Sequence, residues 1–308
     1  MVLVRPSGAA RRFAVVASRV TPTNCRLLEA ARARGAPASL VRPDEALGRI
    51  GPGDIALGRL DVLQSLDGVE PGLGVLQELE RAGALLLNGS GALLAAHDKL
   101  VTALRLGLAG LPHPPTVHFD GTACPSLPLP VVVKPRFGSW GRDVVVCRSR
   151  FALRRTLRRL RNRPWFQRHG ALVQELVPPA GWDLRIVVAG GEVVGAVERW
   201  AAGGEWRTNI ALGGKRVPAD PPLEARLLAV AAAHAVGTDL AGVDLLPDGS
   251  GGFVVLEVNG AVDLTEEYSL GGEAVFERAA DALLASGYAR RDEEEAQAAT
   301  PHSAWARA

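Results

Sequence analysis

The stretch VVVKPRFGSWGRDVVV, from Val131 to Val146, predicts two apolar strands joined by a short loop that contains two glycines. Gly138 and Gly141 can adopt tight or left-handed conformations, so successive backbone N–H groups can turn toward one anion. Lys134, at the end of the first strand, adds a positive charge beside them. The loop lacks the GKS or GKT ending of a P-loop and the GxGxxG spacing of a dinucleotide fold, and it returns to a strand. It therefore indicates a phosphate-binding loop between strands, with an ordinary hairpin and a solvated lysine as the alternative.

Two later stretches predict a cluster of oxygen ligands. AGVDLL places Asp244 in an apolar strand, and FVVLEVNG places Glu257 and Asn259 two residues apart in another, so these two side chains share one face. The intervening PDGSGG is turn chemistry, which lets the two strands pair as a hairpin and bring the three side chains together. Such a set suits Mg²⁺ that bridges substrate phosphates. The alternative, isolated edge charges, is less favoured because buried carboxylates are costly without a cation.

Composition indicates a soluble globular protein of one to three compact units. The chain has 308 residues, of which 47% are hydrophobic and 22% charged, and a formal net charge of +2. So small a charge argues against nucleic acid or a membrane as the general partner. The cysteines, Cys25, Cys124 and Cys147, form no CxxC pair and are expected to be reduced thiols. The start of the chain lacks a long apolar segment, and no stretch approaches about 20 apolar residues, so we expect a cytoplasmic location.

The first third of the chain predicts a small doubly wound α/β domain. FAVVA, PASLVRP, GDIALGRLD and ALLLNGS read as strands, and TNCRLLEAARARG and LGVLQELERAG read as helices between them. Thr21 or Thr23 is the expected N-cap of the first helix, and Gly35 its stop. Prolines at 112, 114 and 115 break the chain before the phosphate-loop segment.

Two further segments are judged mainly by their charge. Residues 151–163 form a predicted helix with six arginines. It is interpreted as a solvated surface helix with Leu153, Leu157 and Leu160 inward; an anion-binding or nucleic-acid-binding face is the alternative. The tail from Arg290 is acidic and then rich in Ala, Ser and Pro, and is expected to be disordered.

Taken in order, several motifs resemble the ATP-grasp superfamily. They are VVVKPRFGSWGRDVVV, LVQELV, GWDLRIVVAGGEVVGAVERW, EWRTNIALGG, AGVDLL and VLEVN. They are most similar to the glutamate ligases typified by the ribosomal-protein S6 modification enzyme, with the related lysine-biosynthesis ligase nearby. TNCRLLEAARARG, LNGS and AHDKL resemble that family's pre-grasp domain and linking helix, so the resemblance runs from Phe13 to Asn259.

The resemblance implies a mixed α/β and α+β fold with ATP-grasp architecture. It divides the chain into a doubly wound pre-grasp domain (1–90), a linking helix with a small lid carrying the glycine loop (91–177), a C-terminal grasp subdomain with the Mg²⁺ site (178–289) and the tail (290–308). The fold implies ATP held between lid and grasp subdomains. Mg²⁺ is the implied metal, with Mn²⁺ as an alternative.

The resemblance also assigns roles to single residues. Lys99, Lys134 and the glycine loop would contact phosphates, residues 174–177 would read adenine through their backbone, and Asp183 would face the ribose. The residues assigned to ATP are Lys99, Lys134, Gly138, Ser139, Trp140, Gly141, Gln174, Glu175, Leu176, Val177, Asp183 and Arg207. Those assigned to the chemistry are Lys134, Arg207 and Asn209, and those assigned to the metal are Asp244, Glu257 and Asn259.

The implied activity is an ATP- and Mg²⁺-dependent carboxylate–amine ligase that forms an amide or peptide bond through an acylphosphate. Arg207 is the expected stabiliser of the acylphosphate and of the tetrahedral oxyanion. The reactants would be an amino acid such as glutamate and a carboxylate on a small molecule, peptide, carrier protein or protein C-terminus. The alternatives are a cofactor polyglutamylase, a specialised-metabolite peptide ligase and a non-catalytic nucleotide-binding module. Because members of the family form dimers or tetramers, a homo-oligomer is the alternative to a monomer.

The sequence identifies substrate-contacting residues less directly than it identifies those assigned to ATP and the metal. Asn24 and Arg59 lie near the ends of early strands, where open α/β sheets bind ligands. Arg185 and Arg199 are candidates for holding a substrate carboxylate, or else structural partners of acidic residues at 183 and 198. Trp140 and Asp143 depart from the polar and small residues that the family's glutamate ligases commonly carry in the loop.

The segment after Asn259 departs further from the family. It reads GAVDLTEEYSLGG where a proline-glycine or serine-rich turn is usual. Asp263, Glu266 and Glu267 could recognise a cationic or amine-bearing substrate; Glu266 and Glu267 are instead expected to start the final helix. The departure leaves specificity for glutamate open.

Overall fold

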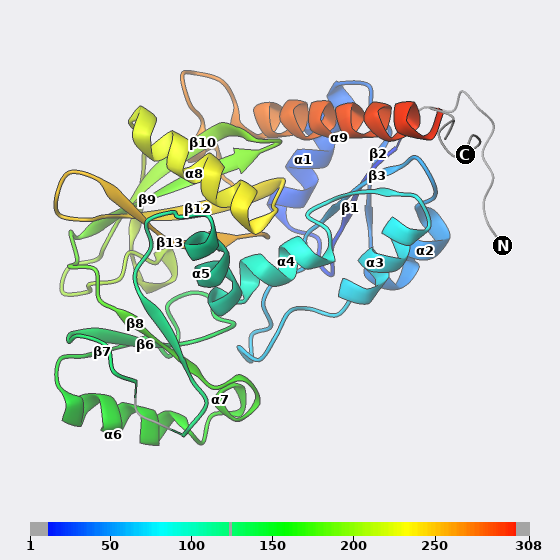
Figure 1. The fold of residues 1–308 in the computed structure, drawn as a ribbon. Coiled ribbons are helices and arrows are strands. Elements are labelled where there is room, and N and C mark those ends of the chain that lie inside the picture. The colour runs from blue at the N-terminus through cyan, green and yellow to red at the C-terminus, as the bar shows by residue number, and fades with distance from the viewer. Residues whose placement is uncertain (1–11, 123–124, 300–308) are drawn as a thin grey trace, which may run out of the picture.

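Three β-sheets with their covering helices organise the chain (Figure 1). The computed structural model describes residues 12–122 and 125–299, so the prediction for Cys124 lies outside the described residues. Cys25 and Cys147 are free thiols. Within the described ranges, no helix combines the length and the apolarity needed to cross a bilayer.

The N-terminal sheet is parallel and has the strand order β2-β1-β3-β4. Its strands are β1 (Phe13–Val16), β2 (Ala38–Val41), β3 (Ile55–Gly58) and β4 (Leu85–Leu87). Side chains alternate across β1: Phe13 and Val15 belong to the core formed with α1 (Pro22–Ala33), whereas Ala14 and Val16 belong to the core formed with α3 (Leu73–Arg81) on the other face. The short η1 (Pro43–Glu45) and α2 (Ala46–Arg49) complete that second layer. Helices on both faces confirm the predicted doubly wound arrangement.

The first helix begins where the sequence predicts. The Thr21 hydroxyl accepts a hydrogen bond from the Asn24 N–H at 3.1 Å, and Gly35 lies beyond the last turn with φ of 78°. Such an N-cap satisfies one of the backbone donors that a helix start leaves unpaired.

The C-terminal sheet is antiparallel, with the order β11-β10-β9-β12-β13. Its strands are β9 (Trp182–Ala189), β10 (Glu192–Trp200), β11 (Lys215–Pro218), β12 (Leu240–Pro247) and β13 (Phe253–Asn259). Helices α4 (Ser90–His97), α5 (Lys99–Leu108) and α8 (Leu223–Val236) share one core with its strands. Asp244 lies directly opposite Glu257 in the β12–β13 pair, which confirms the predicted hairpin.

The sheet in the middle of the chain, here called the middle sheet, has the order β5-β8-β6-β7. Its elements are β5 (Thr116–Phe119), β6 (Val131–Pro135), β7 (Val145–Cys147), β8 (Ala171–Glu175), α6 (Arg150–Leu160) and α7 (Pro164–His169). The phosphate-loop stretch forms the antiparallel pair β6–β7, as predicted. Leu153, Leu157 and Leu160 are buried while the arginines of α6 are exposed, which fits the predicted surface helix. In Figure 1, α6 lies on the side of this sheet away from the C-terminal sheet.

The last helix corrects two predictions. Helix α9 (Val275–Ala299) runs along α1 and continues through residues 290–299, so a disordered tail is wrong for that part; residues 300–308 lie outside the described residues. Alanine, glutamate and arginine are strong helix formers, and an Ala- and Glu-rich stretch can extend a docked helix. Glu266 and Glu267 do not start this helix. They open the short η3 (Glu266–Tyr268), because Gly271 and Gly272, both with positive φ, separate it from α9.

The turn between β9 and β10 offers a test of how α9 docks. Gly190 and Gly191 both have positive φ, so an alanine at either should cost about 1–2 kcal/mol of backbone strain. A Cβ at Gly190 would also meet the Ala282 carbonyl of α9 at 2.3 Å, whereas a Cβ at Gly191 would meet nothing within 4 Å. We expect Gly190→Ala to lower the free energy of unfolding by about 1–3 kcal/mol more than Gly191→Ala in urea titrations. Equal losses would contradict this docking.

Candidate active site

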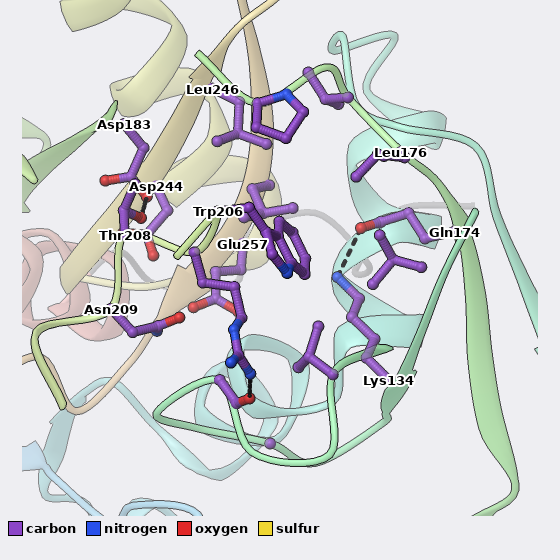
Figure 2. A pocket seen from close by; sticks show the side chains of 18 of the residues that line it. Lys134, Gln174, Leu176, Asp183, Trp206, Thr208, Asn209, Asp244, Leu246 and Glu257 are labelled. Atoms are coloured by element: carbon purple, nitrogen blue, oxygen red, sulfur yellow. Dashed lines mark hydrogen bonds between the residues drawn. The ribbon is translucent and has the colours of Figure 1, made fainter. Parts of the chain in front are cut away.

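A cleft between the C-terminal sheet and the middle sheet gathers the residues singled out by the sequence (Figure 2). Its lining includes all twelve residues assigned to ATP: Lys99, Lys134, Gly138, Ser139, Trp140, Gly141, Gln174, Glu175, Leu176, Val177, Asp183 and Arg207. Asn209, Asp244 and Glu257 line the same cleft. Residues separated by more than a hundred positions in sequence are therefore neighbours in space.

Lys134 projects from β6 into the cleft toward Gln174 of β8. Its Nζ donates a hydrogen bond to Gln174 Oε1 at 2.7 Å, and Gln174 Nε2 donates in turn to the Thr116 hydroxyl at 2.7 Å (Figure 2). Burial, helped by the nearby charge of Lys99, lowers the pKa of Lys134 to about 8 although Glu257 opposes the shift. A buried ammonium with a neutral hydrogen-bond partner is stabilised by any anion that enters the cleft.

This pKa predicts how anion binding depends on pH. The protonated form of Lys134 predominates below pH 8 and is lost as the pH rises through 8, so affinity for a polyphosphate should fall on the alkaline side. If only the protonated form binds, ATP affinity should be roughly tenfold weaker at pH 9 than at pH 7. Lys134→Arg, whose side chain stays charged throughout, should show a flat profile over this range. Titration calorimetry across pH measures both, and a fall of equal size in the arginine variant would exclude Lys134 as its source.

Lys99 joins the glycine loop to the acidic side of the cleft. It is the first residue of α5, which the Asp98 side chain caps, and its Nζ lies 2.9 Å from Glu257 Oε2 and 2.6 Å from the Gly138 carbonyl. Burial alone would raise the pKa of Glu257, but the charges of Lys99 and Lys134 outweigh it and hold that pKa well below its usual range. Glu257 is therefore ionised at neutral pH.

The second carboxylate of the predicted metal set is held by arginines. Asp244 accepts two hydrogen bonds from Arg185, at 2.6 and 2.7 Å, and Arg199 Nη2 lies 2.8 Å from Oδ2, one of the two oxygens that Arg185 contacts. Burial raises the pKa of Asp244, and both guanidinium groups oppose that shift. Arg185 therefore has an acidic structural partner, which is one of the two roles considered for it. The partner is Asp244, a residue that the sequence did not suggest.

Asp183 is also fully engaged. It is buried, it accepts two hydrogen bonds from Arg199 at 2.7 and 2.5 Å, and the Thr208 hydroxyl donates to it at 2.6 Å. Asp183 thus lies at the cleft wall as part of an ion-pair network. Asp183, one of the two acidic residues considered as partners for these arginines, pairs with Arg199, whereas Glu198 accepts a hydrogen bond from Trp200 Nε1 at 2.9 Å.

The acidic side of the cleft fits a cation that brings most of its own oxygen ligands. Among the described residues, no three His, Cys, Asp or Glu side chains are arranged to hold a metal by themselves. Asp244 and Glu257 face each other across the hairpin, and the Asn259 amide lies 3.4 Å from Glu257 Oε1. At nucleotide sites, Mg²⁺ usually binds one or two protein carboxylates together with phosphate oxygens and water.

The loop between β10 and β11, which includes η2 (Ile210–Leu212), holds the glycine loop from the opposite side. Arg207 Nε and Nη2 donate to Glu205 at 3.0 and 2.8 Å, and Arg207 Nη1 donates to the Gly141 carbonyl at 2.6 Å. Gly141 has a φ of 68°, which favours glycine, and a Cβ there would lie 2.7 Å from Asn209 Oδ1 and displace that amide. The two loops therefore place a guanidinium and an amide beside the glycine loop.

A second cavity, here called the side cavity, adjoins the cleft. The two share Ser139, Trp140, Arg199, Asn209 and Glu257. The side cavity is also lined by three residues of the sequence prediction that do not line the cleft: Arg185, Asn259 and Asp263.

Two predicted substrate residues line neither cavity. Asn24 and Arg59 are buried, and Arg59 Nε donates to Asn24 Oδ1 at 2.6 Å. The sequence missed Asp61, His97 and Arg216, which do line the side cavity. Asp61 ends the quoted stretch GDIALGRLD, and His97 lies within the quoted AHDKL motif, so both carried a signal. Burial lowers the pKa of His97 to about 4, so it is neutral at pH 7.

Comparison with known proteins places these features in a family context. Residues 118–275 match the RimK-like ATP-grasp domain. The chain is 35% identical over 251 residues to a probable alpha-L-glutamate ligase of Xanthomonas oryzae pv. oryzae (strain MAFF 311018), covering 76% of this chain and 83% of the relative. It is 31% identical over 212 residues to the tetrahydromethanopterin:alpha-L-glutamate ligase of Methanosarcina acetivorans, covering 63% of this chain and 65% of the relative.

Solved structures support the same fold. A RimK domain ATP-grasp protein from Sphaerobacter thermophilus superposes with a TM-score of 0.64 at 24% identity, covering 89% of this chain and 99% of that one. D-alanine–D-alanine ligase from Bacillus anthracis in complex with ATP superposes with a TM-score of 0.65 at 16% identity, covering 92% and 100%. At these identities the likeness establishes the ATP-grasp fold, which agrees with the predicted fold class.

Proposed function

Because the chain belongs to the RimK-like family of ATP-grasp carbon–nitrogen ligases, we propose that it joins an amino acid to a carboxylate through an acylphosphate. The observation that carries this proposal is the junction of the two cavities. Glu257, Asn209 and Trp140 line both, so a group at the phosphate end of the cleft can meet a group in the side cavity. A ligase that activates a carboxylate with ATP needs this kind of shared wall.

ATP and a divalent metal belong to the ATP-grasp fold, and an ATP-grasp ligase has been solved with Mg and ADP. We assign adenine to the backbone of residues 174–177 and the phosphates to Lys99, Lys134 and the glycine loop. Asp244, Glu257 and Asn259 would hold Mg²⁺, with Mn²⁺ as the alternative; the metal would neutralise phosphate charge. The corresponding division is a pre-grasp domain, a lid and a grasp subdomain.

The chemistry follows from the charges at the junction. A carboxylate oxygen attacks the γ-phosphorus of ATP, a C–O–P linkage forms and ADP leaves. The amine of the second reactant then attacks the carbonyl carbon, the C–O bond to phosphate breaks, and the nitrogen loses a proton as the amide forms. Arg207 would stabilise the oxyanion because a planar guanidinium can donate to two oxygens at once.

Glutamate is the proposed amino acid because the relatives are named alpha-L-glutamate ligases. The proposed acceptor is a carboxylate on a peptide, carrier protein or small molecule. A cofactor as the acceptor is the second candidate, and it is supported by the similarity to the tetrahydromethanopterin ligase. A cytoplasmic location fits these reactants.

Release of ADP and phosphate from Mg-ATP tests the proposal, measured across a matrix of carboxylates and L-amino acids with mass spectrometry of every active mixture. We expect turnover that requires both reactants and yields one amide bond per ADP. ADP release that no pair of reactants stimulates, together with absence of any amide, would overturn the proposal in favour of a non-catalytic nucleotide-binding module.

A further inference from the structure

Three arginines line the side cavity, but two of them already have carboxylate partners. Arg185 is paired with Asp244 through two hydrogen bonds of 2.6 and 2.7 Å. Arg199 is paired with Asp183 and also lies 2.8 Å from Asp244. Both guanidinium groups are buried, and removing either from its carboxylate would leave an uncompensated charge. Neither is therefore available to a ligand at small cost.

Arg216 of β11 is the third arginine, and its charge is poorly matched. Its nearest carboxylate is Glu267, at 3.6 Å, and its side chain is 24% exposed. Its Nε is buried without a hydrogen-bond partner among the described residues. The guanidinium lies 5.9 Å from the ring of Tyr268, a contact that leaves the N–H groups at its edge free to donate.

Two further buried donors lack a partner within the described ranges, the Tyr268 hydroxyl and Arg59 Nη1, but neither residue lines the cavity. Arg59 donates to the carbonyl of Val262 at 2.8 Å and lies 3.8 Å from Asp263, both of which line it. Of the three residues, Arg216 is therefore the one that a ligand in the cavity can reach. A buried donor without a partner is costly, and a carboxylate supplies several acceptor sites in one small group.

The side cavity also carries acidic groups that suit a cation. Asp61 and Asp263 both line it. Burial raises the pKa of Asp61, and the charge of Asp263 adds to the effect. Arg19, which is half exposed, lies 3.8 Å from Asp61, and the buried Arg59 lies 3.8 Å from Asp263, so each carboxylate is only partly neutralised by a guanidinium at that distance. A ligand with one carboxylate and one ammonium therefore matches the cavity better than a simple dicarboxylate does.

We propose that the side cavity binds the α-amino acid reactant and that Arg216 holds its α-carboxylate. The inference rests on the ligase function and adds the residue that selects an amino acid over a plain amine. Arg216 acts on binding and not on the transfer of phosphate, since it does not line the cleft that holds the residues assigned to ATP.

A binding cycle tests the contact directly. Titration calorimetry with Mg²⁺ and a non-hydrolysable ATP analogue would screen the L-amino acids, L-glutamate included, and then compare the best ligand with its decarboxylated amine. We expect Arg216→Met to weaken the binding of the amino acid about 10- to 100-fold, which is the range expected for loss of a hydrogen-bonded charge pair. The amine without the carboxylate should bind the wild type and Arg216→Met equally. Lys215→Met is the matched control, because Lys215 is the adjacent, exposed residue of β11 and does not line the cavity.

The outcomes separate this inference from the ligase proposal. Unchanged affinity in Arg216→Met, or an equal loss in Lys215→Met, would overturn the assignment of Arg216. A wild-type protein that binds none of the amino acids would overturn the amino-acid cavity itself. In either case, the ligase proposal would still hold if ADP release depended on a carboxylate and on an amine other than an amino acid.

Discussion

Replacing Glu257 by glutamine is expected to lower ATP-dependent amide formation by at least about 100-fold without unfolding the protein, because it removes a charged oxygen from the proposed metal set. Glu257 is ionised, lies 2.9 Å from Lys99 and faces Asp244 across the β12–β13 pair. Glutamine keeps the shape of the side chain but is a poor ligand for Mg²⁺. Coupled detection of ADP measures the loss. Glu175→Gln is the matched control, since Glu175 lines the same cleft but is assigned a role through its backbone.

A purely structural role for Glu257 predicts a different result. If Glu257 only neutralised Lys99, its replacement would free that ammonium for phosphate, and ATP would bind at least as tightly with or without Mg²⁺. A metal-binding role predicts that the gain of affinity conferred by Mg²⁺ shrinks in Glu257→Gln while affinity in EDTA is kept. Calorimetric titration of ATP under both conditions distinguishes the two, and an unchanged effect of Mg²⁺ would rule out Glu257 as a ligand.

Local sequence patterns were sufficient for the elements that form the cleft. The β6–β7 pair is encoded by two apolar runs and the glycines between them, and the β12–β13 pair by apolar strands around a glycine-rich turn. In both cases the two partners lie close in sequence, so turn chemistry and alternation fix the register. The N-terminal helix starts at Thr21 for an equally local reason.

The ion-pair network behind the cleft depends on one distant pairing and one local pairing. Arg185 meets Asp244, 59 positions further along the chain, because β9 lies beside β12. Arg199 meets Asp183 across the β9–β10 hairpin, which a two-residue turn closes, so that pairing was open to the same local reasoning. No pattern within β9 specifies β12 as its neighbour, so the sequence could nominate Arg185 but could not choose between a structural partner and a substrate.

Arg216 of the side cavity was missed for a related reason. Arg216 lies on a four-residue edge strand in an arginine-rich chain, and nothing nearby in sequence distinguishes it. What distinguishes Arg216 is its contact with Glu267 and Tyr268, which belong to η3, about 50 positions further along the chain. The extent of α9 was likewise missed, because residues 290–299 continue a helix whose first part packs on α1, whereas composition alone had suggested disorder from Arg290.

Replacing Arg207 by lysine is expected to lower kcat about 100-fold while the KM for ATP changes less than about threefold, since the interaction it removes is proposed to form with the oxyanion. The Arg207 guanidinium uses two nitrogens on Glu205 and a third on the Gly141 carbonyl. The hydrogen bonds from Arg207 lower the pKa of Glu205 to about 2, so the carboxylate that orients the guanidinium stays charged at any working pH. A lysine has a single nitrogen and cannot hold both loops and a substrate oxygen at once.

Steady-state kinetics separate this role from that of a simple latch between the two loops. A latch would act on closure over ATP, so Arg207→Lys and Glu205→Gln would both raise the KM for ATP and affect kcat little. With the proposed role, Glu205→Gln keeps the guanidinium but loosens its orientation, and kcat should fall less than in Arg207→Lys, with KM for ATP nearly constant in both. A larger fall in kcat for Glu205→Gln than for Arg207→Lys would contradict the assignment, because the orienting carboxylate cannot matter more than the cation that it orients.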